Sequence, residues 1–193
     1  MTWAERSGRW IVVVGALVVV ALGALLGVAF RAHTEAAPAA RTKLAGFGEI
    51  AATITDASGK TCQVCLLAAM NQTQRERGLM EVTDPTLGGY DGMVFVYDRP
   101  SSGSFWMRNT PMPLSIAYFD RGGRLVSMSD MAPCADRGDC PLYPAAAPFS
   151  YALEVTRGGL GDLLVTPGSA IVLGARTCPL ANSVRPPGHT GSQ

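Results

Sequence analysis

An uninterrupted apolar segment near the start of the chain, residues 11–30, restricts this sequence more than any other feature. It reads IVVVGALVVVALGALLGVAF and contains no charged residue. A helix of this length spans about 30 Å, the thickness of the hydrocarbon core of a bilayer. Arg6 and Arg9 precede the segment, and a positively charged flank tends to stay in the cytoplasm. We therefore predict a single transmembrane helix, with everything after it outside the cytoplasm.

The sequence leaves a second interpretation of this segment open, namely a signal sequence that is removed after export. Small residues at 27–29 and 37–39 offer two cleavage positions. The apolar part of a signal peptide is usually about 7–15 residues long, however, and this segment is longer. The length favours an uncleaved anchor in the cell membrane, whereas cleavage would give a secreted protein.

The rest of the chain divides by composition. Residues 31–46 are small and polar and offer nothing to bury, which is typical of a linker, and the Pro-rich end of the chain has the same character. The predicted organisation is a cytoplasmic N-terminus (1–10), a transmembrane helix or signal sequence (11–30), a flexible linker (31–46), one folded domain (47–178) and a disordered tail (179–193).

The predicted domain is mainly β. Short apolar segments alternate with turn signals every 8–12 residues or so, and two of the turns, 56–60 and 120–123, have hairpin composition. One short helix is predicted before Gly78, with Asn71 or Thr73 as its N-cap. These patterns predict a compact β-sandwich or barrel-like domain with one short helix.

Charge and histidine content exclude several classes of function. The chain has 16 lysines and arginines against 15 aspartates and glutamates, and the basic residues form no stripe. We therefore expect no nucleic-acid partner. We expect contact with the membrane only through residues 11–30. The two histidines, His33 and His189, lie outside the predicted domain. A Ser-His-Asp or Cys-His nucleophile and a histidine-based zinc site are therefore excluded from it, which favours a non-catalytic role without a cofactor.

All five cysteines follow the apolar segment and are therefore on the predicted extracytoplasmic side, where disulfides are stable. Cys134 and Cys140 bracket a short polar loop, and we predict a disulfide between them. Cys62 and Cys65 have Cys-x-x-Cys spacing but lie in a predicted strand, where residues three apart face opposite sides. We expect one disulfide to Cys178 and one free thiol rather than a redox or zinc motif; the sequence does not decide which cysteine pairs.

Several segments together resemble a known family. They are RERGLM at 75–80, GMVF at 92–95, FWMRNT at 105–110 followed by Pro113 and Leu114, CPLY at 140–143 and LEV at 153–155. In this order and spacing the chain resembles the bacterial and archaeal family called domain of unknown function 192, from about Cys62 to Leu173. The resemblance implies a compact, mainly β, often exported domain and no specific activity. Family members commonly carry an aspartate where this chain has Ser115.

Glu154 is the most informative candidate for a functional side chain. It lies in an otherwise apolar strand, FSYALEV, on the face opposite Leu153 and Val155. A solvated outer face is one interpretation. The other is a partly buried carboxylate paired with Arg77 or Arg108, because an unpaired buried charge is costly. The candidate pocket or ion-pair residues are Glu154, Arg77, Arg108, Trp106, Asn109, Thr110 and Tyr143.

These observations lead to three functional hypotheses. The first is a membrane-anchored or secreted, non-catalytic binding or accessory module of the cell envelope. The second is an enzyme of unfamiliar type that uses Glu154 with Arg77 or Arg108 in a pocket near Trp106. The third is soft-metal (copper) binding through the seven methionines between Met70 and Met131 together with the cysteines.

Overall fold

The computed structural model describes residues 40–178. The predicted anchor at 11–30, most of the predicted linker and the predicted tail at 179–193 lie outside the described residues. Within residues 40–178, no helix has the length and apolar character needed to cross a membrane.

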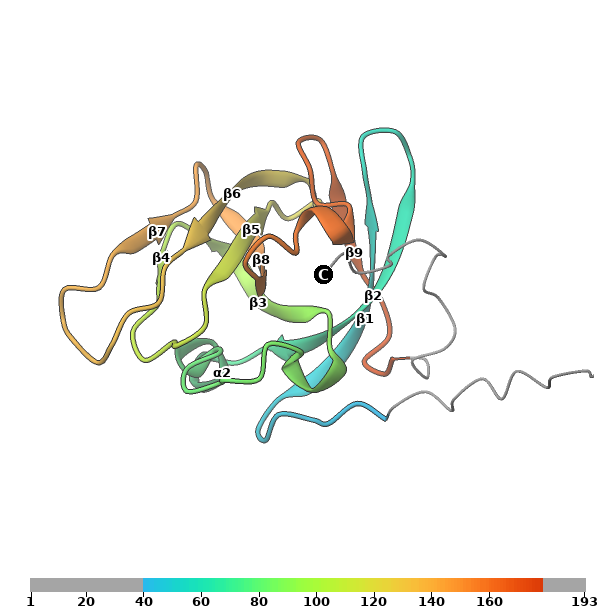
Figure 1. Cartoon of the computed structure of the whole chain (residues 1–193). Coiled ribbons are helices and arrows are strands. Elements are labelled where there is room, and N and C mark those ends of the chain that lie inside the picture. Colours follow the sequence, from blue (N-terminus) through green and yellow to red (C-terminus); the bar gives the residue numbers. More distant parts are fainter. Residues whose placement is uncertain (1–39, 179–193) are drawn as a thin grey trace, which may run out of the picture. The chain divides into compact units, whose positions relative to one another are not determined.

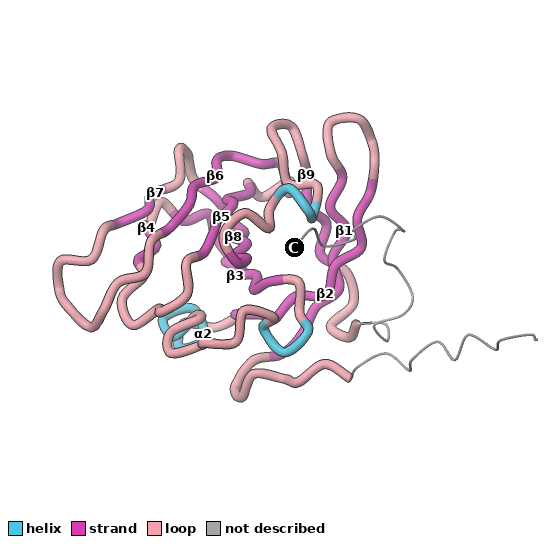
Figure 2. The backbone as a smooth tube through the Cα atoms, in the orientation of Figure 1, coloured by secondary structure: helices cyan, strands magenta, loops and turns pink. Residues whose placement is uncertain are grey.

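The described domain is built from nine strands and one short α-helix (Figures 1 and 2). The strands are β1 (Gly48–Thr55), β2 (Thr61–Ala69), β3 (Gly92–Ser101), β4 (Ser104–Trp106), β5 (Leu114–Phe119), β6 (Leu125–Met131), β7 (Leu142–Pro144), β8 (Phe149–Thr156) and β9 (Ala170–Leu173). The helices are α2 (Gln72–Arg77) and the 3-10 turns η2 (Leu87–Gly89) and η3 (Gly161–Leu163).

Seven strands form one sheet, in the order β6-β5-β8-β3-β2-β1-β9, and β4 pairs only with β7 in a separate ribbon. All neighbours in the large sheet are antiparallel except β2 and β3. The two outer strands, β6 and β9, approach each other, as two backbone hydrogen bonds show. The Leu125 amide donates to the Ser169 carbonyl at 2.9 Å, and the Ile171 amide donates to the Gly123 carbonyl at 2.8 Å. The mainly β prediction is confirmed, but the arrangement is a single curled sheet rather than two stacked sheets.

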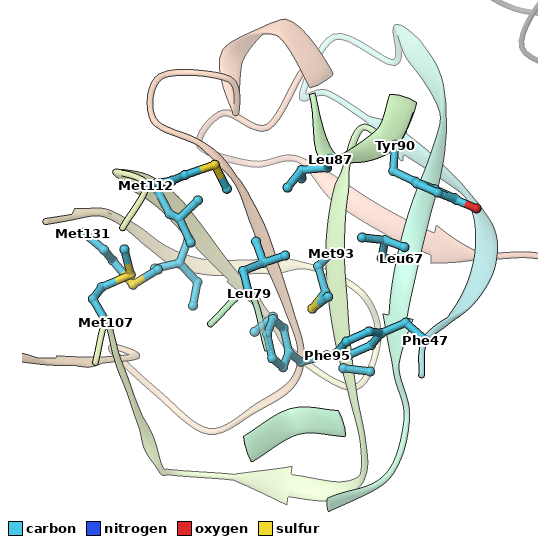
Figure 3. Close-up of a cluster of buried hydrophobic side chains, with 14 of the residues drawn as sticks. Phe47, Leu67, Leu79, Leu87, Tyr90, Met93, Phe95, Met107, Met112 and Met131 are labelled. Carbon is cyan, nitrogen blue, oxygen red and sulfur yellow. The ribbon is translucent and has the colours of Figure 1, made fainter. Parts of the chain in front are cut away.

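The curled sheet buries side chains on both faces. On its inner face, Ile171 of the end strand β9 and Phe119 of β5, the strand next to the other end, belong to one apolar cluster. On its outer face a second cluster includes Met93 and Phe95 (Figure 3). Tyr118 belongs to the same cluster, and Phe105 of β4 and Tyr143 of β7 pack against it. Every residue of β5 is therefore buried, which explains why its sequence is apolar except for Ser115.

Helix α2 lies in the connection between the parallel strands β2 and β3. Asn71 is its N-cap: the Gln74 amide donates to the Asn71 side chain at 2.9 Å, and the Gln74 side chain accepts from the Asn71 amide at 3.2 Å. Arg75 ties the helix to β3, because its guanidinium donates to the Val96 carbonyl at 2.9 Å and lies over the Tyr97 ring. The short-helix prediction is confirmed, with Asn71 as the cap.

The last residues of the predicted linker contact the domain. The Thr42 amide donates to the Gly88 carbonyl at 2.8 Å, and the Arg41 side chain donates to the Gly89 carbonyl at 3.2 Å. Arg77 donates to the Ala45 carbonyl at 2.6 Å. The folded domain therefore begins several residues earlier than the composition indicated.

We expect Gly88→Ala to destabilise the domain by about 2–3 kcal/mol, against about 1 kcal/mol for Gly59→Ala. Both glycines have positive φ, +67° and +88°, so an alanine is strained at either position. A Cβ at Gly88 would also overlap the Thr42 carbonyl oxygen, whereas a Cβ at Gly59 meets nothing. Urea unfolding of the two variants measures the difference. Equal losses in the free energy of unfolding would show that residues 41–46 do not pack against η2.

Candidate functional site

Three loops line an open cleft of about 590 Å³ on the outer side of the sheet. The first loop follows α2, the second follows β4 and the third follows β6. The residues that line the cleft are Glu81, Thr83, Asn109, Thr110, Pro111, Pro133, Cys134, Ala135 and Asp136. Of the predicted pocket residues, the structure places Asn109 and Thr110 here.

The backbone of this cleft is held in an uncommon conformation. Glu81 and Asn109 have φ of 62° and 55°, in the left-handed region that L-residues rarely adopt. The two residues are joined directly, because the Glu81 amide donates to the Asn109 carbonyl at 2.8 Å. Thr110 completes a tight turn by donating its amide to the Met107 carbonyl at 2.9 Å. Strained residues that meet in one cleft are a common property of functional sites.

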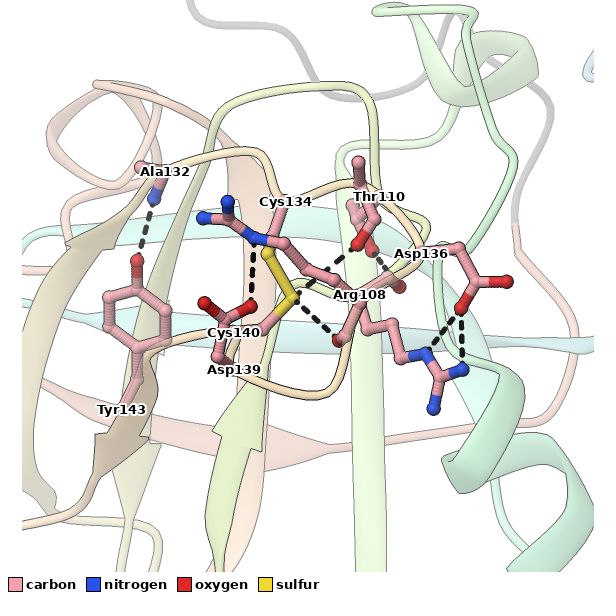
Figure 4. Close-up of a disulfide and its surroundings, with 10 residues drawn as sticks. Arg108, Thr110, Ala132, Cys134, Asp136, Asp139, Cys140 and Tyr143 are labelled. Carbon is pink, nitrogen blue, oxygen red and sulfur yellow. Dashed lines mark hydrogen bonds and ion pairs between the residues drawn. A yellow bond between two sulfur atoms is a disulfide. The ribbon is translucent and has the colours of Figure 1, made fainter.

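A disulfide fixes the third loop of the cleft (Figure 4). Cys134 and Cys140 are bonded, as their spacing predicted. Backbone bridges join Cys134 to both Arg108 and Thr110. Arg108 also pairs with Asp136 of this loop, with its Nε 2.6 Å from Oδ1. The cleft wall is therefore held by one covalent bond, two bridges and one ion pair.

The two predicted aromatic residues, Trp106 and Tyr143, lie on the β4–β7 ribbon beside the cleft rather than in it. The Trp106 side chain is 49% exposed, and its cross-strand partner Leu142 is 64% exposed. The Tyr143 hydroxyl accepts from the Ala132 amide at 2.9 Å, and its carbonyl accepts from the Tyr118 hydroxyl at 2.6 Å. Tyr143 thus connects the ribbon to the sheet.

Glu154 is not paired with either predicted arginine. Its register neighbours, Met93 of β3 and Ile116 of β5, belong to the outer-face cluster, and Glu154 itself is 4% exposed. Burial raises the pKa of its carboxyl to about 8. None of the salt bridges found in residues 40–178 includes it.

The ion-pair prediction was wrong because both arginines have other partners. Arg77 donates to the Ala45 carbonyl and lies over the Phe47 ring, with its guanidinium carbon 5.1 Å from the ring centroid. Arg108 pairs with Asp136. Protonation removes the need for a counter-ion, because a neutral carboxylic acid does not carry the desolvation cost of a charge.

Ser115, the departure from the family pattern, is buried beside a carboxylate from the neighbouring strand. Its hydroxyl donates to Asp130 Oδ1 at 2.5 Å and accepts from the Gly158 amide at 3.0 Å. Ser115 and Asp130 are register partners on β5 and β6. A carboxylate is therefore present here although Ser115 replaces the common aspartate.

The remaining cysteines form a second disulfide, Cys65–Cys178, and Cys62 has a free thiol. Beside the disulfide, the Glu49 carboxylate accepts from the Cys178 amide at 3.1 Å and from the Tyr90 hydroxyl at 2.7 Å. These two hydrogen bonds lower the pKa of Glu49 below its ordinary value, and the one from the Cys178 amide has the larger effect.

Most of the methionines that suggested a soft-metal site lie in the apolar core. Met93, Met107, Met112 and Met131 are all buried in the outer-face cluster (Figure 3). Met128, by contrast, is 42% exposed on the same strand as Met131. Packing therefore accounts for the buried methionines.

Comparison with known families identifies this domain. The family model of DUF192, described as "Uncharacterized ACR, COG1430", matches residues 53–173. The chain belongs to the DUF192 family. The match includes the strands and loops that form the cleft, and it confirms the resemblance seen in the sequence.

Solved structures share the DUF192 fold of this chain. One is a protein of unknown function from Novosphingobium aromaticivorans DSM 12444, which is 29% identical, with a TM-score of 0.56 over 72% of this chain and 94% of that chain. Another, from Sinorhizobium meliloti 1021 and provisionally described as a transcription regulator, is 23% identical, with a TM-score of 0.56 over 68% of this chain and 98% of that chain. No curated protein matches the chain.

Proposed function

We propose that this DUF192 domain is an extracytoplasmic, non-catalytic binding module, anchored to the cell membrane by residues 11–30, and that its cleft binds a small organic cation. The observation that carries the proposal is the charge of the cleft lining. Its two carboxylates are Glu81 and Asp136, and no basic residue is among the lining residues. Arg108 pairs with Asp136, so Glu81 is the lining carboxylate for which residues 40–178 provide no ion pair.

The geometry of the cleft suits binding. Its walls are fixed by the Cys134–Cys140 disulfide and by the hydrogen bond between Glu81 and Asn109, so little ordering is needed when a ligand enters. Thr83, Asn109 and Thr110 add neutral polar residues to the lining, next to prolines. A few polar groups in a largely apolar concave surface are typical of small-molecule sites.

Two observations support an extracytoplasmic location. The apolar segment at 11–30 is long enough to cross a bilayer and has positive residues before it. The two disulfides are the kind of cross-link that persists in oxidising compartments. A cleft in a tethered domain would then sample solutes outside the cytoplasm.

The enzyme hypothesis built on Glu154 has less support. Glu154 is not among the residues that line the cleft, and its side chain faces Met93 and Ile116. The soft-metal hypothesis has less support for a similar reason, since the buried methionines pack in the core.

Calorimetric titration of the full-length protein tests the proposal with matched probes. We expect putrescine, spermidine or choline to bind, and succinate and acetate not to bind. Glu81→Gln, which keeps the shape of the side chain and removes its charge, should raise the Kd of a bound amine by about tenfold, as expected for loss of a charged contact of about 1.4 kcal/mol.

Asp139→Asn is the matched control. Asp139 lies in the same disulfide loop but pairs with Arg137 and does not line the cleft. Its neutralisation changes the net charge as much as Glu81→Gln does, so a general electrostatic effect would appear in both variants. Binding of the anions, or equal effects of the two substitutions on amine binding, would contradict the proposed function.

A further inference from the structure

We infer that Glu49, Cys65 and Cys178 form a zinc site when the Cys65–Cys178 disulfide is reduced. One carboxylate oxygen and the two sulfurs lie within 4.8 Å of one another. The three residues come from β1, β2 and the segment after β9, and they meet at the point where the described chain ends. This inference is independent of the cleft and of the function proposed for it.

The carboxylate is already placed for coordination. Its two oxygens accept hydrogen bonds from the Cys178 amide, at 3.1 Å, and from the Tyr90 hydroxyl, at 2.7 Å. Each oxygen keeps a further lone pair that can face the sulfurs. Hydrogen bonds of this kind orient the ligands of metal sites in proteins.

The position of Cys65 does not depend on the disulfide alone. Its amide donates to Asp91 Oδ2 at 2.8 Å, and its carbonyl accepts from the Asp91 amide at 2.9 Å. Cys65 is also buried, at 2% exposure, within a strand that is paired on both sides. We therefore expect its sulfur to stay beside Glu49 after reduction.

The chemistry balances with a dithiol as the reductant. A dithiol reduces the disulfide to two thiols and is itself oxidised to a disulfide. Zn²⁺ then displaces one proton from each thiol and is held by two thiolates and one carboxylate, with water in the fourth position. Thiolate and carboxylate ligands with an open position suit zinc, whereas magnesium and calcium prefer oxygen ligands alone.

The expected consequence is that the metal replaces the covalent bond as the link between Cys178 and the β1–β2 hairpin. In the oxidised protein the link is the disulfide, and in the reduced protein it would be the Zn²⁺ ion. The two states differ in strength, since the metal link depends on the free zinc concentration.

Zinc titration of the full-length protein carrying Cys62→Ser, Cys134→Ser and Cys140→Ser tests this inference, because only Cys65 and Cys178 then remain as thiols. The protein is reduced with a phosphine, freed of reductant and titrated with Zn²⁺ against a chromophoric chelator. We expect one Zn²⁺ per reduced chain and none per oxidised chain. Co²⁺ should give a sulfur-to-cobalt charge-transfer band only in the reduced form.

Glu49→Gln separates a built site from a pair of thiols. We expect it to weaken Zn²⁺ binding by about 10–100-fold, while Glu76→Gln on the exposed surface of α2 leaves the affinity unchanged. Near-ultraviolet circular dichroism checks that the reduced protein is folded. If the triple variant does not fold, the same titration is made with Cys62→Ser and compared with Cys62→Ser/Cys178→Ser.

Three results would overturn the inference. They are absence of stoichiometric Zn²⁺ binding by the folded, reduced protein, equal affinity in the Glu49→Gln variant, and binding of Cu⁺ without binding of Zn²⁺. The last result would indicate a thiolate pair that does not use the carboxylate.

Discussion

We expect Cys178→Ser to destabilise the oxidised domain by about 5 kcal/mol. The Cys65–Cys178 bond joins residues 113 apart in the sequence, so its loss releases a large closed loop in the unfolded chain. This loss is a large part of the free energy of unfolding of a domain of this size, so the variant should unfold at a far lower urea concentration. Cys178 is the better position for the substitution because Cys65 is buried in the core, where a serine would add its own cost.

The double variant Cys134→Ser/Cys140→Ser is the matched control. Its disulfide closes a separation of only six residues, and the same chain-entropy relation gives about 2 kcal/mol. Equilibrium urea unfolding without reductant compares the two. Similar losses in both variants would contradict the loop-length argument and point to native-state contacts as the main source of stabilisation.

The cysteines illustrate what local sequence decides and what it does not. The bond between Cys134 and Cys140 follows from their short separation. Alternation along β2 correctly predicted that Cys62 and Cys65 lie on opposite faces. It did not predict which of the two faces Cys178 would reach. That choice depends on how the whole sheet curls, which is a property of distant strands.

The same division holds for the fold. The hairpin at residues 56–60 was predictable because turn residues lie between two apolar segments, and β1 and β2 are found on either side of it. The parallel pairing of β2 with β3 and the place of β8 between β3 and β5 were not predictable. These pairings join segments far apart in the sequence, and no local pattern encodes them.

For the cleft, the FWMRNT motif pointed to Asn109 and Thr110, which do line it. Glu81 and Asp136 were missed because they come from two other loops. Glu81 directly follows the RERGLM motif, and Asp136 lies inside the predicted disulfide loop, so proximity to those features was the signal that could have found them. The positive φ of Glu81 has no sequence signature, since glutamate rarely adopts it.

We expect Glu154→Gln to stabilise the domain at pH 8 by about 3–5 kcal/mol and to have little effect near pH 4. The folded-state pKa of Glu154 is about 8, above the ordinary value of 4.5. Below the unfolded-state pKa the carboxyl is protonated in both states, so the wild-type protein suffers no penalty. As the pH rises from 4.5 towards 8, the unfolded state loses its proton while the folded state keeps it. Stability therefore falls over this window.

Glutamine has nearly the same shape and cannot ionise, so the Glu154→Gln variant should lack this loss. Urea unfolding at several pH values between 4 and 8 measures the difference between the two proteins. Glu76→Gln, on the exposed surface of α2, is the control and should run parallel to the wild type. Parallel profiles for Glu154→Gln would show that the carboxylate is ionised in the folded domain. A partner for that charge would then have to be sought, because an ionised group at 4% exposure does not persist without one.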